Sequence, residues 1–239
     1  MKKRNESKIT MAALMMMAAM AMTSCASSKK INNDSNASKS SEMGKNEEDL
    51  DNNYLVLSDT QQDIVKKNNA FALRLFNKVA DLESKVISPM SVSYLMGMLA
   101  NGADGSTQQE ILKAIGCEGV SVNDLNELYK AMLLNANHQD KQTTVNIANY
   151  IAVNKNFKLD KNFCQQVSDS YQAGIESLDF TSSKSTDRIN GWCKEKTNGM
   201  IPRIIDQVSA DAVSYLMNAI YFKGTWQNKF NAKDTKLEN

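Results

Sequence analysis

The stretch VSYLMNAIYFKGTW, residues 213–226, decides the fold of this chain. Between Val213 and Phe222 nearly every position on both alternating faces is apolar or aromatic, and Lys223 with Gly224 ends the run. This pattern predicts a central strand that other elements cover on both faces. A buried core helix is the alternative, but a run rich in Tyr, Phe, Ile and Val favours a strand.

Asn218 interrupts this apolar run near its middle. Its amide carries two hydrogen-bond donors and an acceptor, and leaving such groups unpaired in a core costs about 1–3 kcal/mol. We therefore expect polar partners for Asn218 beneath the sheet.

Hydrophobic periodicity and capping residues predict the elements that precede this strand. Helices are expected over residues 58–82, 88–100, 106–116, 121–137, 159–171 and 185–198, and strands over residues 85–87, 143–153 and 173–180. Ser88 is expected to cap the second helix, with Pro89 at its first position, and Ser106 with Gln109 to form a capping box for the third. This order of elements indicates an α+β fold with a sheet of at least three strands.

The strand at residues 143–153 has a clear alternation. Successive side chains of a strand point to opposite faces of the sheet. One face is expected to carry Val145, Ile147, Ile151 and Val153, and the other Asn146, Ala148, Tyr150 and Ala152.

The N-terminus predicts export. Basic residues are followed by an apolar run from Met11 to Met22 that is too short to span a bilayer, and the run ends on Thr-Ser-Cys25. Residues 1–24 therefore resemble a lipoprotein signal peptide, with Cys25 as the lipidated first residue of the mature chain; an ordinary cleaved signal is the alternative. Residues 25–57 are polar and are expected to form a disordered tether to a domain over residues 58–239.

Composition excludes several classes of function. The formal net charge is +1, which gives no reason to expect a nucleic-acid partner. His138 is the single histidine and no Cys-x-x-Cys pair occurs, so neither a multi-histidine metal site nor a zinc ribbon is predicted, and no cofactor is expected. Besides Cys25 the chain has Cys117, Cys164 and Cys193, an odd number for which buried free thiols are expected.

No catalytic residues are predicted. A nucleophilic cysteine needs a neighbouring base, and nothing in the sequence links His138 to a cysteine. Ser88 and Ser91 lack the Gly-x-Ser-x-Gly surroundings of a hydrolase nucleophile and are expected to have structural roles. We therefore do not expect an enzyme.

Five motifs, in this order, resemble those of the serpins, a family of metastable serine protease inhibitors. They are residues 71–76 (FALRLF), residues 87–91 (ISPMS), residues 102–107 (GADGST), residues 189–192 (INGW) with 197–201 (TNGMI), and residues 218–226 (NAIYFKGTW). The resemblance implies several N-terminal helices packed on a large, mostly antiparallel sheet. Residues 58–239 are expected to form the N-terminal portion of that fold, with its C-terminal part absent.

The resemblance implies a conformational mechanism. In serpins a protease cuts an exposed reactive loop, which then inserts as a new strand into the large sheet and carries the acylated protease with it. By resemblance, Ser88, Pro89, Ser91 and Asn218 belong to the "shutter" beneath the sheet centre, where the Asn218 amide is expected to bond to the two serines. Trp226 and Thr235 are expected to belong to the "breach", where insertion starts.

Two functional hypotheses follow. The first is a lipid-anchored serpin of the outer membrane, periplasmic or cell-surface, whose full-length form inhibits a serine or cysteine protease; the resemblance places its reactive loop after residue 239. The alternative is a non-inhibitory surface lipoprotein, an interaction module that keeps part of the fold. The predicted partners are a protease and, through Cys25, the membrane.

Overall fold

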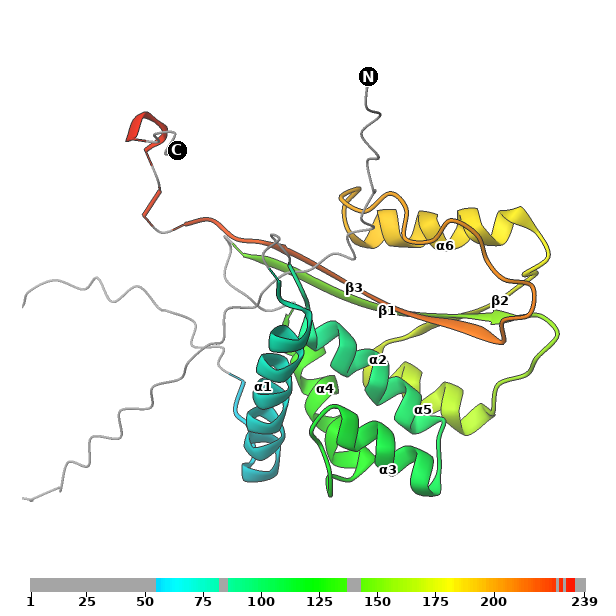
Figure 1. Ribbon diagram of the computed structural model, residues 1–239, viewed down its shortest axis with the longest axis horizontal. Coiled ribbons are helices and arrows are strands. Elements are labelled where there is room, and N and C mark those ends of the chain that lie inside the picture. Colours follow the sequence, from blue (N-terminus) through cyan, green and yellow to red (C-terminus); the bar gives the residue numbers. More distant parts are fainter. Residues whose placement is uncertain (1–54, 82–85, 137–142, 227, 230, 235–239) are drawn as a thin grey trace, which may run out of the picture. The chain divides into compact units, whose positions relative to one another are not determined.

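The computed structural model describes residues 55–81, 86–136, 143–226, 228–229 and 231–234 (Figure 1). The helices are α1 (Asp59–Val79), α2 (Pro89–Asn101), α3 (Gly105–Ala114), α4 (Val122–Ala136), α5 (Lys161–Tyr171), α6 (Ser183–Lys196) and the short 3₁₀ helix η1 (Ala232–Asp234). The strands are β1 (Thr144–Asn154), β2 (Gly174–Leu178) and β3 (Ser214–Lys223). The predicted α+β class is confirmed. The signal peptide and most of the tether lie outside the described residues.

The three strands form one sheet in the order β2-β1-β3. β1 pairs with β2 in parallel and with β3 antiparallel, so the described sheet is mixed, and the longer of its two pairings is antiparallel. β3 pairs with one strand in the described sheet, so its predicted central position is not confirmed, whereas its two faces are covered in part, by α2 on one side and α6 on the other. Met217, Ala219 and Ile220 are buried, whereas the flanking positions are half-buried or exposed because they lie at the edge of the described sheet.

The sheet separates two hydrophobic cores. The larger core contains residues of α1 to α5 together with Ile151 and Val153 of β1. The smaller core contains Ile189, Trp192 and Cys193 of α6 with residues of the opposite sheet face. Figure 1 shows α6 on one side of the strands and the other labelled helices on the opposite side. The predicted alternation of β1 is confirmed, since Tyr150 and Ala152 lie in the second core.

Local capping sets where several helices begin. Ser58 and Gln61 form a reciprocal capping box at α1. Ser88 caps α2, with Pro89 at the start, as predicted. The predicted start of α3 is wrong, because the Asp104 side chain accepts from Gly105 N and opens the helix one residue before Ser106.

The short strand predicted at residues 85–87 is not confirmed. Val86 and Ile87 have no regular secondary structure, and residue 85 lies outside the described ranges. A strand forms only where a neighbouring strand supplies its backbone hydrogen bonds. In the described part of the chain no strand pairs with these two residues.

The ends of β1 and β2 are joined by an ion pair that predicts acid sensitivity. The Asp179 carboxylate accepts from Lys155 Nζ at 2.7 Å, and from Thr181 Oγ1 at 2.6 Å and Thr181 N at 3.1 Å. These bonds lower the pKa of Asp179 from 3.8 to about 2, and the bond from Lys155 has the largest effect. Because the folded pKa is the lower one, the stabilisation is complete above about pH 4 and is lost as the pH falls toward 2.

We therefore expect Asp179→Asn to flatten the loss of stability between about pH 4 and pH 2. Urea midpoints measured at several pH values, for this variant and the wild type, provide the check. Lys155→Met should also flatten the pH dependence of stability between about pH 4 and pH 2, because the bond from Lys155 lowers the pKa of Asp179 the most. Parallel pH curves for all three proteins would contradict the assignment.

Candidate functional site

Two asparagines face each other near the middle of β1 and β3. Asn149 and Asn218 are partners in the antiparallel register, and Asn218 Nδ2 donates to Asn149 Oδ1 over 2.8 Å. Each lies two positions from Ile151 or Leu216, which belong to the larger core. Since side chains two positions apart share a face, the pair points toward the helices α1 to α5.

Asn149 connects this pair to α5. Its Nδ2 donates to the main-chain oxygen of Tyr171 over 2.7 Å. Tyr171 is the last residue of α5, and Gln172 follows it with a left-handed φ of 50°. The last carbonyl groups of a helix have no partner within the helix. The Asn149 side chain therefore satisfies one of them and fixes the end of α5 against β1.

The Tyr171 side chain continues the connection into the helices. Its hydroxyl donates to Asn126 Oδ1 over 2.7 Å, and Asn126 Nδ2 donates to Asn101 Oδ1 over 2.8 Å. Asn101 Nδ2 in turn donates to the main-chain oxygen of Gly97 in α2 over 2.8 Å. Side chains from β3, β1, α5, α4 and α2 thus form one polar chain, which we call the asparagine–tyrosine network: Asn218, Asn149, Tyr171, Asn126 and Asn101.

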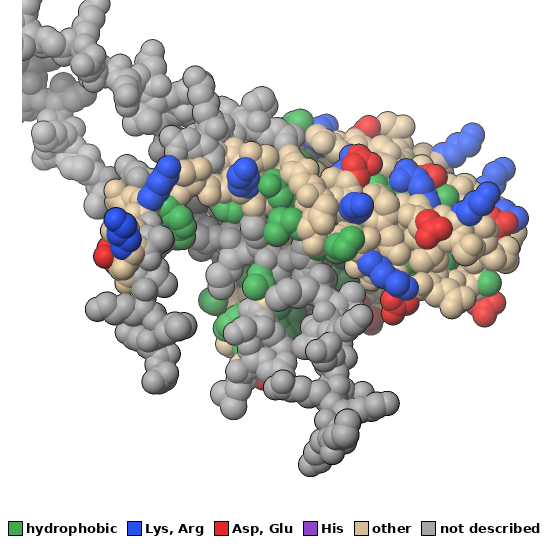
Figure 2. Space-filling view, turned by 90° about the horizontal axis from the view of Figure 1, so that it is seen from above, with side chains coloured by type: hydrophobic (Ala, Val, Ile, Leu, Met, Phe, Trp, Pro, Cys, Tyr) green, Lys and Arg blue, Asp and Glu red, His purple; other side chains and the backbone are tan. Residues whose placement is uncertain are grey.

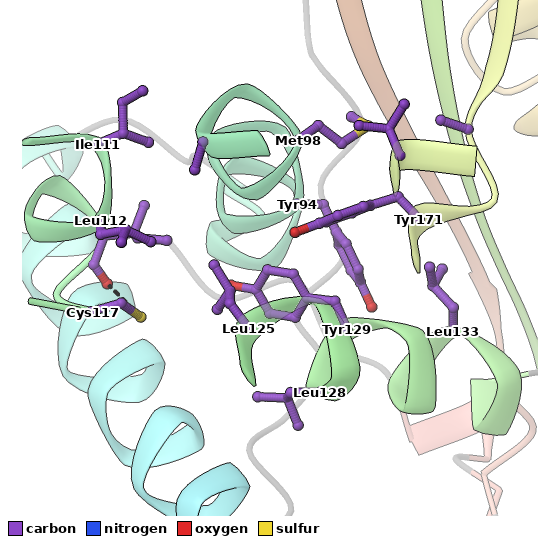
Figure 3. Close-up of a cluster of buried hydrophobic side chains, with 14 of the residues drawn as sticks. Tyr94, Met98, Ile111, Leu112, Cys117, Leu125, Leu128, Tyr129, Leu133 and Tyr171 are labelled. Carbon is purple, nitrogen blue, oxygen red and sulfur yellow. Dashed lines mark hydrogen bonds between the residues drawn. The ribbon is translucent and has the colours of Figure 1, made fainter. Parts of the chain in front are cut away.

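The hydroxyl end of this network lies among aromatic rings (Figure 3). The ring of Tyr94 lies 4.8 Å from that of Tyr129 and 6.2 Å from that of Tyr171. Burial raises the pKa of all three tyrosines far above their usual range, helped by the Tyr129 phenol for Tyr94 and Tyr171 and by the Cys117 thiol for Tyr129. These hydroxyls therefore stay neutral, and those of Tyr129 and Tyr171 form hydrogen bonds, to Asn68 and Asn126.

One acceptor of the network has no partner. Asn218 Oδ1 is buried without a hydrogen bond among the described residues, and the hydroxyl of Tyr94 is in the same situation. A buried acceptor left unpaired costs about 1–3 kcal/mol, and nearly all such atoms in folded proteins are satisfied. The position of Asn218 Oδ1 is therefore one at which a donor group would be stabilising.

The predicted bonds between Asn218 and the two serines are wrong. The Ser88 hydroxyl instead accepts from Ser91 N at 3.1 Å and from the Ser91 hydroxyl at 2.8 Å, which closes the first turn of α2. Ser88, Pro89 and Ser91 thus lie together, as their spacing implies, and α2 packs against β3. The side chain that accepts the hydrogen bond of the Asn218 amide is that of Asn149, on the neighbouring strand β1.

The other predicted site residues are scattered or undescribed. Trp226 follows β3 with 69% of its surface exposed. Thr235 and Cys25 lie outside the described residues. Among the helices that the structure describes, none has the length and apolar character needed to cross a membrane.

The described residues offer little for catalysis or metal binding. They contain no group of three or more His, Cys, Asp or Glu side chains able to hold a metal ion. Cys117, Cys164 and Cys193 are free thiols; the first and last are buried, as expected, and Cys164 is half-buried. Burial raises the pKa of the Cys117 thiol to about 11. On the face seen in Figure 2 basic and acidic side chains are interspersed.

Comparison with known families agrees with this architecture. The sequence model of the family described as "Serpin (serine protease inhibitor)" matches residues 66–239. The chain belongs to the serpin family. The resemblance noted in the sequence motifs is thereby confirmed at the level of the family, and so is the serpin-like fold.

Several serpins resemble the chain over most of its length. Serine protease inhibitor 42Dd of Drosophila melanogaster is 31% identical over 68% of this chain and 45% of its own length. Iripin-1 of Ixodes ricinus is 33% identical over 71% of this chain and 45% of its own length. The crystal structure of the thermophilic serpin tengpin in its latent state superposes with a TM-score of 0.68 at 31% identity, covering 74% of this chain and 48% of tengpin. The chain thus spans about half the length of the serpins it matches.

Sequence reasoning missed four members of the network: Asn149, Tyr171, Asn126 and Asn101. Asn149 lies between Ile147 and Ile151, on the face of β1 expected to be apolar, and a polar residue at such a position is a signal of a buried hydrogen bond. Tyr171 and Asn126 had no comparable signal. Their roles depend on how α4 and α5 pack, which no local pattern contains.

Proposed function

We propose that this chain supplies the N-terminal part of an inhibitory serpin that traps a serine or cysteine protease. Membership of the serpin family supports the inhibitor class. The half-length match to other serpins supports a contribution of one part of the fold. Serpins act as inhibitors and not as enzymes, and the proposal follows the family in this respect.

The observation that carries this proposal is the geometry of β3. In the described sheet β3 pairs only with β1, and its other edge, with which no described strand pairs, is where a further strand would add. Insertion of a serpin reactive loop is an established case of strand addition to a sheet. A strand that arrives beside β3 would also lie next to Asn218, whose buried Oδ1 has no donor among the described residues.

Within this proposal the shutter comprises Ser88, Pro89, Ser91 and Asn218, and Asn149 extends it. The first three begin α2, which packs against β3, while the asparagine pair lies on the same face of the sheet. Separation of the sheet from α2 would disturb both groups of bonds. Trp226 and Thr235 are assigned to the breach, which we take to lie beyond the end of β3.

The test is made on the full-length gene product that contains residues 26–239. It is incubated with trypsin-like, chymotrypsin-like and papain-like proteases, and the mixtures are examined by denaturing gel electrophoresis. A covalent complex resistant to SDS, absent when the protease nucleophile is blocked beforehand, is the expected result. Cleavage of the protein by every protease without any complex would instead favour the non-inhibitory interaction module.

Membrane anchoring through Cys25 is a separate part of the proposal. The basic start, the short apolar run and the Thr-Ser-Cys ending support it. Acyl chains add about 0.8 kcal/mol of membrane affinity for each buried CH₂. Ala26, the residue after the lipidated cysteine, gives no reason to expect retention in the inner membrane, so we propose anchoring at the outer membrane.

We expect Cys25→Ala to abolish incorporation of a lipid analogue in metabolic labelling and to release the protein from the membrane fraction. Cys164→Ala is the matched control, because it removes another cysteine and should leave both labelling and fractionation unchanged. Equal label in the wild type and the Cys25 variant would refute the anchor. That result would leave the protease-inhibitor proposal intact.

A further inference from the structure

The helix α6 and the segment that follows it are tied together by side-chain bonds. Asn190 Oδ1 accepts from Ile204 N at 2.8 Å and Ile205 N at 3.1 Å, and its Nδ2 donates to Ile205 O at 2.9 Å. The Thr186 hydroxyl accepts from Val208 N at 3.1 Å. Residues 183–208 therefore form a unit, which we call the α6 cover, whose internal bonds do not depend on the strands.

A charged cluster holds this cover on the sheet. The Arg188 guanidinium contacts both carboxylate oxygens of Glu176, with Nη2–Oε2 at 2.8 Å and Nε–Oε1 at 3.2 Å. The Tyr150 hydroxyl donates to the same Oε2 over 2.8 Å. Arg188 thus binds from the helix a carboxylate that belongs to β2 and is already bonded to β1.

An aromatic stack adjoins the ion pair. Trp192 lies one helical turn after Arg188, and its ring stacks on that of Tyr150 with centroids 5.1 Å apart and planes 20° from parallel. The Arg188 guanidinium carbon lies 5.7 Å from the centroid of the same Tyr150 ring. Tyr150 is therefore held by Glu176 within the sheet and by Arg188 and Trp192 from α6. Movement of α6 away from the strands breaks the contacts of Arg188 and Trp192 together and leaves the Tyr150–Glu176 bond in the sheet.

The ion pair is distinctive within the described part of the chain. Among the ion pairs found there, that of Arg188 and Glu176 is the one joining α6 to a strand. Burial alone would raise the pKa of Glu176, but the bonds from Arg188 and Tyr150 outweigh it and hold the pKa below its usual value. The two side chains remain 45% and 36% exposed, so dissolved salt reaches and weakens the pair.

We propose that Tyr150, Glu176, Arg188 and Trp192 form a latch that controls local opening of the α6 cover, ahead of unfolding of the sheet. Proteins open in cooperative units with free energies below that of global unfolding. The α6 cover has the properties of such a unit, with its own internal bonds and one ionic fastening to the strands. The inference concerns opening of the fold and does not depend on inhibition of a protease.

Hydrogen exchange followed by mass spectrometry tests the latch in the full chain at low urea. In Glu176→Gln and Arg188→Met, peptides of α6 should exchange about two- to fivefold faster, while peptides of β1 and β3 should be unchanged. Lys113→Met removes a surface ion pair of α3 and is the matched control, with no expected effect on α6. High salt should accelerate α6 in the wild type and much less in the two variants.

Two further results complete the test. The exchanged pair Glu176→Arg with Arg188→Glu should recover part of the lost protection, because an ion pair of opposite polarity forms at the same place. The latch would be overturned if hydrogen exchange became faster by the same factor in α6 and in the strands. It would also be overturned if exchange in α6 became no faster in any variant or in high salt. The wild-type arm of the salt experiment needs no variant: if salt does not accelerate exchange in α6 more than in the strands, the latch is overturned even where a substitution prevents folding.

Discussion

Asn149→Leu is expected to destabilise the protein by about 3 kcal/mol, and Asn218→Leu by much less. Leucine at position 149 leaves the Tyr171 carbonyl and the Asn218 amide without their partner, and each costs about 1–3 kcal/mol. Leucine at position 218 removes one bond to Asn149 but also removes the buried, unpaired Oδ1 of Asn218. These two effects are similar in size and opposite in sign.

Urea unfolding of the two variants measures this difference. Asn146→Leu serves as the control, because Asn146 is an exposed residue of the same strand and its replacement should change stability by less than about 0.5 kcal/mol. Equal destabilisation by Asn149→Leu and Asn218→Leu would contradict the assignment of two hydrogen-bond partners to Asn149 and one to Asn218. A larger effect at position 218 would favour the partners first expected from sequence, Ser88 and Ser91.

Gly97→Ala is expected to destabilise the protein by about 2–4 kcal/mol, although alanine is the better helix former. A Cβ at position 97 would lie 2.5 Å from the Tyr171 hydroxyl and 3.0 Å from Cε2 of Tyr129. Overpacking of a core costs about 1–3 kcal/mol, and displacement of the Tyr171 hydroxyl also weakens its bond to Asn126. The gain in helix propensity, about 1 kcal/mol, does not offset these costs.

Gly191→Ala is the matched control for this prediction. Gly191 lies inside α6, and a Cβ there meets no atom within 4 Å. That variant should gain up to about 1 kcal/mol in the free energy of unfolding. The destabilisation by Gly97→Ala should shrink in a Tyr171→Phe background, since the closest contact is then gone. A Gly97→Ala variant as stable as the wild type would show that the tyrosine rings shift freely.

Local chemistry made much of the fold predictable. Ser88 and Pro89 marked the start of α2 because capping and the fixed φ of proline act within one turn. The alternation in β1 correctly assigned Ile151 and Tyr150 to opposite cores, because the strand period depends on the strand alone. The family motifs identified the serpin fold for the same reason, since each motif is a short local pattern.

The errors came from side-chain contacts that no short sequence pattern contains. Gln108, next to the predicted capping box, donates instead to the carbonyls of Ala100 and Ala103, and Asp104 caps α3. The partner of Asn218 lies 69 positions earlier and is set by strand register, which no local pattern of Asn218 contains. The candidate site is built mainly from such contacts. The sequence therefore predicted that Asn218 belongs to the site but not which side chain it bonds to.

The pairing of β1 with β3 also has a consequence for the rate and order of folding. Val153 pairs with Ser214, so the first rung of this ladder closes a loop of about 60 residues that contains α5, β2 and α6. Contacts so distant in sequence form slowly, whereas α2 contacts α3 and α4 over shorter separations, such as the 25 positions between Asn101 and Asn126. The ladder that carries Asn149 and Asn218 is therefore expected to form late, on a helical core that is already assembled.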